Sequence, residues 1–326
     1  GVPPQLRYRD SSVQRTLLAN GQISTRRDQS GSDASIVGGR WAQVAVEVHD
    51  ARQLAPAAAL DVHGFELRRC PTRLVREQFY NEEDLFRRYF DECTDLVKAA
   101  TGAEIVRAFD YNVRSAGGSK AATPVQGGGI VVQPPAQAVH NDYTLTSGPA
   151  RLRQLAAPPR LNDVSRRIQG EAPLLTREEA ELAASTRFAI VNVWRNISEE
   201  PVRVLPLACC DARSVVASDL CVFEIHYADR VGENYFAAHE PRHTWYYYPR
   251  MAREEALLIK QWDSHGALVT GSDSCSTFSL HTAFQDPTTP VGSPDRESIE
   301  VRCICVFGAS SIPRPIVVGE TPRPRL

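Results

Sequence analysis

The sequence predicts a mainly β protein, an antiparallel sandwich or barrel with a few flanking helices. Two observations lead to this fold class. From Phe188 onward the chain is a succession of short segments rich in β-branched and aromatic residues, separated by clusters of Pro, Gly, Asp and Ser. The clearest helical periodicity lies earlier, in residues 82–100. No linker divides the strands into two cores, so we expect a single domain.

The N-terminal segment differs in composition from the rest of the chain. Residues 1–35 are polar, rich in Arg and Ser, and show little periodicity. We therefore expect an extended N-terminal arm, followed by one domain over residues 36–326. Residues 41–49 (WAQVAVEVH) alternate between apolar and polar side chains, which predicts the first strand of that domain.

Residues 82–100 have the features of an amphipathic helix. Asn81 is a good N-cap, and three acidic residues follow it in the first turn, where the helix dipole is positive. Gly102 stands where a C-cap is expected. The apolar residues recur at intervals of three and four: Leu85, Phe86, Tyr89, Phe90, Cys93, Leu96 and Val97. We expect this helix to cover a sheet and assign it no chemistry.

Residues 104–113 predict a further strand, and residues 115–138 form a loop rich in Gly and Pro. The loop contains three consecutive glycines, but lacks the GK[ST] ending of a P-loop and the G-x-G-x-x-G pattern of a dinucleotide site. We interpret it as a flexible segment, a lid beside the motif that follows it.

The second half of the chain supplies most of the predicted strands. They are bounded by turn-forming residues and have no detectable internal repeat. The predicted segments are 187–195, 202–206, 219–227, 233–238, 242–248, 255–262, 277–284 and 297–307.

Composition excludes several classes of protein. Among 326 residues, 37 Lys and Arg balance 39 Asp and Glu, which argues against a nucleic-acid-binding surface. No apolar run approaches the ~18 residues of a membrane span. Eight cysteines occur without a C-x-x-C pair, so we expect buried, reduced thiols and a cytoplasmic location rather than a cysteine zinc site.

The first chemical motif is His140-Asn141-Asp142. Side chains at positions i and i+2 of a strand point to the same side, so the imidazole and the carboxylate can bind one metal ion. A third ligand then completes a facial triad with open positions. By itself the motif is equally compatible with a polar turn.

A second motif combines His281 with Arg296 and Ser298. His281 lies in the strand-like segment FSLHTAF, and a guanidinium beside a hydroxyl suits the distal carboxylate of a dicarboxylic acid. The alternative is a solvated face of the last strand, because Glu300 and Arg302 fall on the same side.

The order H-x-D, many strands, His, then R-x-S resembles that of Fe(II)/2-oxoglutarate-dependent oxygenases. The chain is similar to their fungal hydroxylase/desaturase family, which includes AsaB-type, gibberellin desaturase and CmcJ-like proteins. The resemblance covers roughly residues 135–307, with a weaker match at 41–113. It is carried by the segments HNDYT, VNVWRN, PLACCD, HTWYYYPRM, EALLIKQWDS, LHTAFQDPTTP and RESIEVR.

The resemblance implies a double-stranded β-helix (jelly-roll, cupin-like) barrel with its core at about residues 135–310. It places His140, Asp142 and His281 at the iron-ligand positions. The implied cofactor is Fe(II), with 2-oxoglutarate and O2 as cosubstrates. The implied reaction is hydroxylation, desaturation or oxidative cyclisation at an unactivated C–H bond of a specialised metabolite or its amino-acid-derived precursor.

The resemblance also assigns the cosubstrate pocket. Arg296 occupies the position that binds the 2-oxoglutarate carboxylate, and Ser298 matches the accompanying hydroxyl. The chain departs from the family pattern at WRN, so Arg195 is a further candidate for binding a carboxylate, with a structural salt bridge as the alternative.

The implied partner is a small molecule, and aromatic residues are candidates for its site. Tyr143, Trp194 and Trp245 are the substrate-binding candidates, together with the run Tyr246–Tyr248. They either line an apolar, uncharged cavity or belong to an aromatic core.

Two other functions fit parts of the sequence. His239-Glu240-Pro241-Arg242-His243 matches the H-E-x-x-H motif of zinc hydrolases, but Pro241 and the β-prone text after it disfavour the helix that this chemistry requires. A catalytically degenerate barrel that acts as a binding module is the other alternative, although all three iron-ligand positions are filled.

Overall fold

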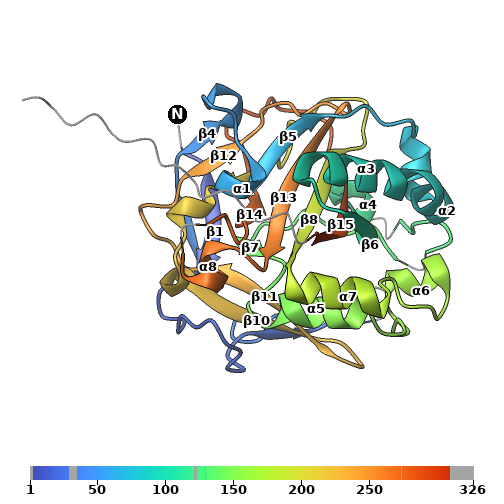
Figure 1. The fold of residues 1–326 in the computed structure, drawn as a ribbon. Helices are drawn as coiled ribbons and strands as arrows, with labels where there is room; N and C mark the ends of the chain where they lie inside the picture. Colours follow the sequence, from blue (N-terminus) through green and yellow to red (C-terminus); the bar gives the residue numbers. More distant parts are fainter. Residues whose placement is uncertain (1–2, 29–34, 121–122, 129, 273, 309–326) are drawn as a thin grey trace, which may run out of the picture.

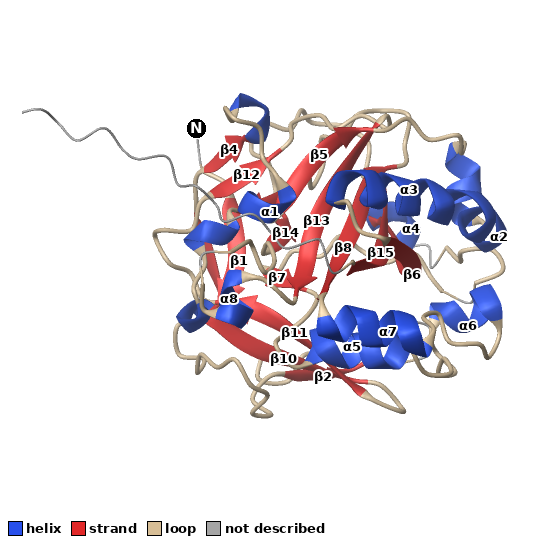
Figure 2. Ribbon diagram, viewed as in Figure 1, coloured by secondary structure: helices blue, strands red, loops and turns tan. Residues whose placement is uncertain are grey.

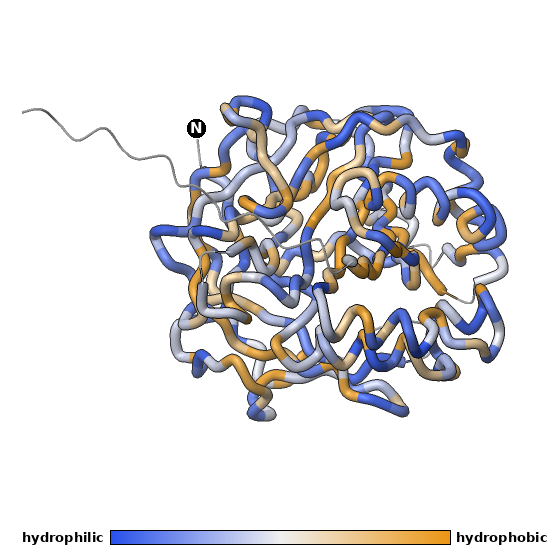
Figure 3. The backbone as a smooth tube through the Cα atoms, viewed as in Figure 1, coloured by the Kyte–Doolittle hydropathy of each residue, from blue (hydrophilic) through white to orange (hydrophobic). Residues whose placement is uncertain are grey.

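The computed structural model describes residues 3–28, 35–120, 123–128, 130–272 and 274–308. Two large β-sheets form the body of the protein, and the longest helices gather on one side of it (Figures 1 and 2). Apolar residues follow the central strands, while polar residues dominate the outer loops (Figure 3). The predicted fold class, mainly β with flanking helices, is confirmed.

The five-stranded sheet is antiparallel throughout and has the order β5-β13-β8-β15-β6. Its strands are β5 (Phe65–Arg69), β13 (Glu255–Asp263), β8 (Arg187–Asn196), β15 (Glu297–Phe307) and β6 (Ile105–Ser115). In β8 every residue is buried, since both faces of this sheet are covered.

The eight-stranded sheet is assembled from shorter strands in the order β2-β10-β11-β7-β14-β9-β12-β4. They are β2 (Ser24–Arg26), β10 (Leu220–His226), β11 (Val231–Ala237), β7 (His140–Asn141), β14 (His281–Ala283), β9 (Leu207–Cys210), β12 (Trp245–Tyr247) and β4 (Val48–Asp50). A separate pair joins β1 (Gln5–Arg9) to β3 (Trp41–Ala45).

The helices lie beside the five-stranded sheet and around the edges of the larger one (Figure 1). They are α1 (Leu60–His63), α2 (Glu82–Asp84), α3 (Phe90–Thr101), α4 (Ala116–Lys120), α5 (Ser147–Leu155), α6 (Val164–Gln169), α7 (Arg177–Ser185) and α8 (Ala267–Thr270). Short 3-10 turns occur at Ala51–Gln53, Arg76–Tyr80, Ala212–Ser214 and Ala217–Asp219.

The helix predicted over residues 82–100 is confirmed with its caps. It runs from α2 through a π-helical turn (Leu85–Tyr89) into α3. The Asn81 side chain accepts a hydrogen bond from the backbone N–H of Asp84, and Gly102 ends α3 in the left-handed conformation at φ 69°. The helix packs its apolar face on the five-stranded sheet, as expected.

Several local expectations need correction. Residues 202–206 form no strand, and 41–49 divides into β3 and β4. The residues of the expected N-terminal arm contribute β1 and β2 to sheets, with Tyr8 fully buried. Helices α5 to α7 escaped the sequence analysis because their apolar stripes are short and interrupted by Arg and Glu.

The five-stranded sheet presents two different faces. Its outer face carries Val193, Ile299 and Val301, which pack against α3. Its inner face carries Asn192 and Arg302, and both bond to Asp142 at the end of β7 in the other sheet. The inner face therefore meets the eight-stranded sheet where the predicted metal motif lies.

Candidate metal centre

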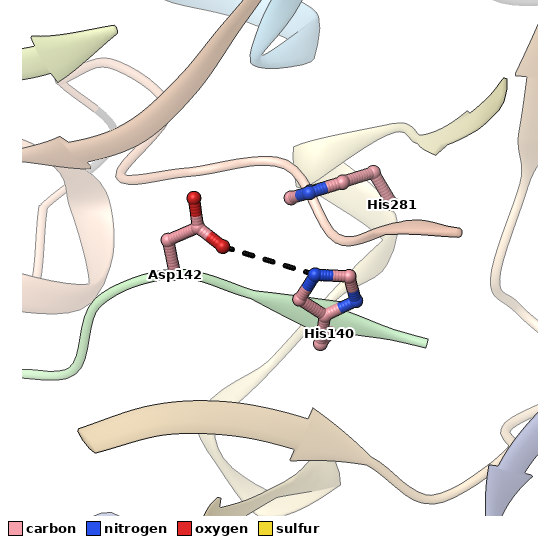
Figure 4. A group of neighbouring side chains, drawn as sticks. All are labelled: His140, Asp142 and His281. Carbon is pink, nitrogen blue, oxygen red and sulfur yellow. Dashed lines mark ion pairs between the residues drawn. The ribbon is translucent and has the colours of Figure 1, made fainter. Parts of the chain in front are cut away.

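The structure brings His140, Asp142 and His281 together. β7 and β14 are antiparallel neighbours in which His140 is paired with His281, and Asp142 follows directly after β7. One potential ligand atom from each side chain lies within 4.8 Å of the others. The three side chains converge on one space in Figure 4, with Nε2 of His140 3.7 Å from Oδ1 of Asp142.

Backbone carbonyls orient both histidines. The Nδ1–H of His140 donates to the carbonyl of Ala138 at 2.7 Å, and that of His281 donates to the carbonyl of Ser279 at 3.3 Å. These bonds select the tautomer that leaves Nε2 unprotonated and turned toward the shared space. Metal-binding histidines are typically held in this way.

Asp142 is held by three polar neighbours. Its Oδ2 accepts hydrogen bonds from Nδ2 of Asn192 at 2.9 Å and from Nε of Arg302 at 3.1 Å. Its backbone N–H donates to Oε1 of Gln261 at 3.0 Å. The bonds from Asn192 and Arg302 occupy Oδ2, and the other oxygen, Oδ1, faces His140.

The electrostatics leave all three side chains in the metal-binding protonation state. Burial, reinforced by the neighbouring His281, lowers the pKa of His140 to about 4, and burial also lowers the pKa of His281. Burial alone would raise the pKa of Asp142, but the charge of Arg302 and the two histidines outweigh it and hold that pKa well below its usual range. Two neutral imidazoles and one carboxylate at neutral pH are the ligands that divalent transition metals require.

Arg296 and Ser298 lie on the inner face of the five-stranded sheet, which also carries Asn192 and Arg302, the residues that bond to Asp142. Their exposed fractions are 3% and 1%, so the alternative of a solvated face is wrong for them. The Arg296 guanidinium stands 5.4 Å from the Trp194 ring centroid and donates to the carbonyl of Leu205. Burial, reinforced by the charge of Arg114, lowers the pKa of Arg296 to about 9.

Both residues carry a buried polar atom that lacks a hydrogen-bond partner. These atoms are Nε of Arg296 and Oγ of Ser298. Leaving a buried donor unpaired costs about 1–3 kcal/mol, so a fold tolerates two such atoms together where a ligand satisfies them. A carboxylate accepts from both, and the residues present therefore fit a dicarboxylic cosubstrate.

A cavity of about 730 Å³ opens beside Asp142. Tyr143 lines it, whereas the expectation of an aromatic, uncharged wall is wrong. The charged residues that line it are Arg27, Asp28, Asp110, Asp142, Arg151, Arg167, Arg230, Glu233 and Arg302. Within this lining Arg302 pairs with Asp110 and Asp142, while Arg151 and Arg167 pair with Asp163 and Glu82, which do not line the cavity. The cavity is therefore polar without carrying a large net charge.

The other aromatic candidates have different positions. Trp194 is buried on the inner face, next to Arg296. Trp245 faces away from the cluster, because His281 is paired with Cys209, and Cys209 is paired with Tyr246 rather than with Trp245. The Trp245 indole N–H donates to the Tyr8 hydroxyl at 2.7 Å inside an apolar core, so it does not line the cavity.

Arg195 is not brought to the cluster. It points to the outer face, where its guanidinium donates to the Tyr89 hydroxyl and to the carbonyls of Cys70 and Arg253, at 2.6–3.1 Å. This position agrees with a structural role for Arg195 rather than with carboxylate binding. The partners of Arg195 are carbonyls and a hydroxyl, however, and not the acid of a salt bridge.

The H-E-x-x-H segment does not form a zinc site. Residues 239–243 contain no helix. Both ring nitrogens of His243 already form hydrogen bonds. Nε2 lies 3.1 Å from a carboxylate oxygen of Asp219, and Nδ1 lies 3.2 Å from the Tyr8 hydroxyl. The zinc-hydrolase alternative therefore lacks its required geometry.

A second group of potential ligands, Asp61, Asp263 and Cys275, is neutralised by cations. Nζ of Lys260 lies 2.5 Å from Asp61 and 2.9 Å from Asp263, and Arg187 pairs with both carboxylates as well. These charges form an ion-pair network in which Asp263, Lys260 and Arg187 are buried and Asp61 is exposed, and its carboxylates are already paired with cations.

The predicted lid, residues 115–138, is partly anchored. Val125 and Val132 are buried in the core cluster beneath α3, and the segment begins with α4. Residues 121–122 and 129 lie outside the described residues. Motion of this loop with ligand stays a prediction.

The residues that support Asp142 are not evident from sequence patterns. Asn192, Gln261 and Arg302 are far from it in sequence, and each is unremarkable by itself. A signal was present in the last strand, where Ser298, Glu300 and Arg302 alternate with strongly apolar residues. In a strand that is buried on both faces, such an alternation indicates a polar interior site.

No helix within the described ranges is long and apolar enough to cross a membrane.

Comparisons with known proteins give consistent results. A family described as "Oxidoreductase/YMDC permease-like domain" matches residues 19–306. A protein from Aspergillus novofumigatus named Fe(II)/2-oxoglutarate-dependent dioxygenase nvfI is 30% identical over 273 residues, covering 82% of this chain and 84% of that protein. Hydroxylase/desaturase efuI from Hormonema carpetanum is 28% identical over 273 residues, covering 79% and 82%.

The relatives extend to bacteria and to solved structures. An uncharacterized protein from the dcmA 3' region of Methylophilus leisingeri is 32% identical over 199 residues, covering 60% of this chain and 91% of that protein. A solved structure named iron and alpha-ketoglutarate-dependent endoperoxidase NvfI superimposes with a TM-score of 0.70 at 23% identity, over 94% of this chain and 97% of that one. The likeness shows that the two chains share a fold.

Proposed function

The chain belongs to the oxidoreductase family that contains Fe(II)/2-oxoglutarate-dependent dioxygenases and hydroxylase/desaturases, and from this premise we propose that His140, Asp142 and His281 hold its iron. The observation that carries the proposal is the convergence of three ligand atoms within 4.8 Å, with both histidines oriented by backbone carbonyls. The enzyme oxidises an unactivated C–H bond of a specialised metabolite or its amino-acid-derived precursor, by hydroxylation, desaturation or oxidative cyclisation.

Fe(II) and 2-oxoglutarate, when bound with O2, supply the oxidising chemistry, and the protein supplies ligand geometry and a shaped cavity. His140 and His281 offer neutral Nε2 atoms, while Asp142 offers the charge that retains a divalent ion. Arg302 and Asn192 would keep the carboxylate in one orientation, with Oδ1 left to bind the metal.

We further propose that Arg296 and Ser298 bind the distal carboxylate of 2-oxoglutarate. The unpartnered Nε and Oγ supply one donor each to that carboxylate. Pairing with a carboxylate also stabilises the charged form of Arg296, which burial disfavours. The small-molecule substrate enters the polar cavity beside Asp142, which Tyr143 lines.

We also propose the domain bounds, the barrel topology and the cellular location of the protein. We assign residues 36–326 to one oxygenase domain with a double-stranded β-helix barrel whose core lies at about 135–310, and residues 1–35 to an N-terminal arm whose β1 and β2 pair with strands of that domain. Asp142, which follows β7 of the eight-stranded sheet and bonds to Asn192 and Arg302 of the five-stranded sheet, links the two sheets and supports this assignment. All eight cysteines are free, which supports a reducing compartment and a cytoplasmic location.

Anaerobic titration tests the proposal. Wild-type protein mixed with Fe(II) and then 2-oxoglutarate should develop the visible charge-transfer band of the chelate. His140→Ala and His281→Ala should lose the band, while the matched control His239→Ala should keep it. If the wild type binds 2-oxoglutarate but the band does not develop, the protein is a binding module. If His239→Ala loses the metal, the metal site is formed by His239 and His243 instead.

A further inference from the structure

Trp194 lies on the inner face of the five-stranded sheet, and the Arg296 guanidinium lies over its indole ring, 5.4 Å from the ring centroid. Trp194 is 2% exposed and belongs to an apolar cluster with Phe65, Leu207 and Tyr248. A cation over an aromatic face is attracted to it, and tryptophan gives the strongest attraction. Because the indole is enclosed by its apolar neighbours, it is a rigid support for the guanidinium.

Leu205 provides a second support for Arg296. Its carbonyl accepts a hydrogen bond from Nη1 of the guanidinium. Leu205 has a φ of 49°, a conformation that is rare for a bulky residue, and the Pro206 that follows restricts its backbone further. Backbone held in such a conformation is found mainly at functional sites. The ring and the carbonyl together fix the orientation of the guanidinium.

Other arginines of this chain show how a guanidinium binds a carboxylate. Arg76 donates to Glu297 through Nε and Nη2, and Arg187 donates to Asp263 through the same two nitrogens. In Arg296 the third nitrogen, Nη1, already bonds to a backbone carbonyl, whereas Nε is buried and has no hydrogen-bond partner within the described residues. The edge that binds carboxylates elsewhere in the chain is therefore available for one from a ligand.

Glu300 is the acid that shares this face of β15 with Arg296, and it is paired in register with Trp194. Its carboxylate accepts a hydrogen bond from Nη2 of Arg302 at 2.9 Å. No ion pair joins Glu300 to Arg296 in the part of the chain that the structure describes. The bond to Arg302 therefore keeps the acid away from the carboxylate-binding edge of Arg296.

We propose that Trp194 is a positioning residue for 2-oxoglutarate. Its ring, together with the Leu205 carbonyl, holds the Arg296 guanidinium so that the Nε and Nη2 edge meets the distal carboxylate. The inference rests on the proposed function, since it takes Arg296 as the residue that binds this carboxylate. It assigns Trp194 to the cosubstrate rather than to the oxidised substrate, for which the sequence made it a candidate.

Calorimetry of the Fe(II)-loaded protein under anaerobic conditions tests this role without relying on turnover. Trp194→Leu should weaken 2-oxoglutarate binding about tenfold, because the guanidinium loses a desolvated aromatic contact and its fixed orientation. Trp194→Phe keeps an aromatic face and should recover part of the affinity, and it supplies the test if Trp194→Leu does not fold. Unchanged affinity in Trp194→Leu would overturn the proposal.

Phe65→Leu is the matched control, because it also replaces an aromatic ring by leucine in the same apolar cluster. Among the described residues, the Phe65 ring contacts the rings of His63, Tyr246 and Tyr248 but no arginine. This variant should unfold at a lower urea concentration and bind 2-oxoglutarate like the wild type. If it loses as much affinity as Trp194→Leu, general disturbance of the cluster explains both losses and the positioning role is wrong.

A cosubstrate analogue shows whether Trp194 acts through Arg296. 2-Oxopentanoate keeps the keto-acid end and lacks the distal carboxylate, so the wild type and Trp194→Leu should bind it equally well. If Trp194→Leu loses affinity for this analogue and for 2-oxoglutarate by the same factor, the ring does not act at the distal carboxylate, and the proposal is overturned.

A double-mutant cycle gives an independent measure with 2-oxoglutarate itself. Residues that act through one another are not additive. Trp194→Leu should therefore change the affinity of the Arg296→Gln protein by less than about twofold, against about tenfold in the wild type. A further tenfold loss in the Arg296→Gln protein would show that Trp194 acts independently, which contradicts the positioning role.

Arg296→Gln also separates this inference from the proposed function. If Arg296→Gln weakens 2-oxoglutarate binding and Trp194→Leu does not, the positioning role is wrong while the proposed function stands. If Arg296→Gln binds 2-oxoglutarate as tightly as the wild type does, the assignment of Arg296 fails and the inference fails with it. Circular dichroism and retained Fe(II) binding establish that each variant is folded.

Discussion

The two faces of the five-stranded sheet are built from the same strands and are both buried, yet they differ in chemistry. The outer face presents Val193, Ile299 and Val301 to α3. The inner face presents Asn192 and Ser298, which are equally inaccessible to water. Apolar burial contributes about 25 cal/mol per Å², so the outer face stabilises the fold, whereas each unpartnered polar atom on the inner face destabilises it.

The proposed ligand site accounts for this polar composition, which burial alone does not explain. Among the described buried side-chain atoms, those without a hydrogen-bond partner include Oδ1 of Asn192, Nε of Arg296 and Oγ of Ser298. Buried polar atoms need a hydrogen-bond partner, which the proposed ligand would supply to Arg296 and Ser298. Substitutions on the two faces should therefore have opposite effects on stability and on binding.

The largest effect is expected where the inner face meets the metal ligands. His140→Ala or His281→Ala should abolish Fe(II) binding and all turnover, because two protein ligands rarely retain iron. The fold should persist, since neither side chain belongs to an apolar core cluster. Metal content after anaerobic loading and succinate release measure the two effects. Wild-type turnover in either variant would contradict the assigned triad.

Substitution of Arg296 should affect the affinity for 2-oxoglutarate far more than the free energy of unfolding. Arg296→Met should raise the apparent constant for 2-oxoglutarate at least tens-fold, because removing one partner of a desolvated charge pair costs about 2–5 kcal/mol. The same change removes the unpaired buried Nε, but it also removes the donor that bonds to the carbonyl of Leu205. The free energy of unfolding of the metal-free protein should therefore change by less than about 1 kcal/mol.

Succinate release against 2-oxoglutarate concentration and urea unfolding measure the two quantities in Arg296→Met. Arg296→Lys should fall between the wild type and Arg296→Met in affinity, since an ammonium lacks the fork geometry. Arg107→Met is the control for the loss of a surface arginine. An unchanged 2-oxoglutarate curve for Arg296→Met would remove its assignment.

The outer face should show the reverse behaviour. Ile299→Ala removes a fully buried side chain from the cluster beneath α3, which should lower the free energy of unfolding by about 2–5 kcal/mol. The affinity of the folded protein for 2-oxoglutarate should stay at the wild-type value. Urea unfolding and calorimetry test the two parts, and a large loss of affinity would show that the faces are coupled.

Ser298→Ala should have the smallest effect. The hydroxyl supplies one hydrogen bond to the carboxylate, so its loss should weaken 2-oxoglutarate binding by about fivefold, or about 1 kcal/mol. Because Oγ has no protein partner, stability should not fall. Calorimetry resolves this difference, and a destabilised Ser298→Ala protein would indicate a structural hydroxyl instead.

Local sequence patterns were sufficient to predict those helices and strands whose formation depends on neighbouring residues. The caps at Asn81 and Gly102 bracket the predicted helix, and the period-two segments predicted β6, β8 and β15 closely. The spacing of His140 and Asp142 predicts that both serve one site. These features depend on backbone geometry over a few neighbouring residues, so local sequence patterns are sufficient to predict them.

The resemblance to a family supplied what spacing alone leaves open. His281 is remote from His140 in sequence, and only the resemblance linked it to the motif. The comparisons then confirmed the family and the class of enzyme. The individual site residues remain predictions that the geometry supports.

The amino-acid sequence by itself determined the fold class, the capped helix and the pairing of His140 with Asp142, because local periodicity and spacing encode them. Tertiary structure alone decided that Arg195 turns outward, that His243 is committed to Asp219, and that Arg302 supports Asp142. Alternation along a strand shows which side chains share a face. It does not show what covers that face, since this depends on packing between segments far apart in the chain.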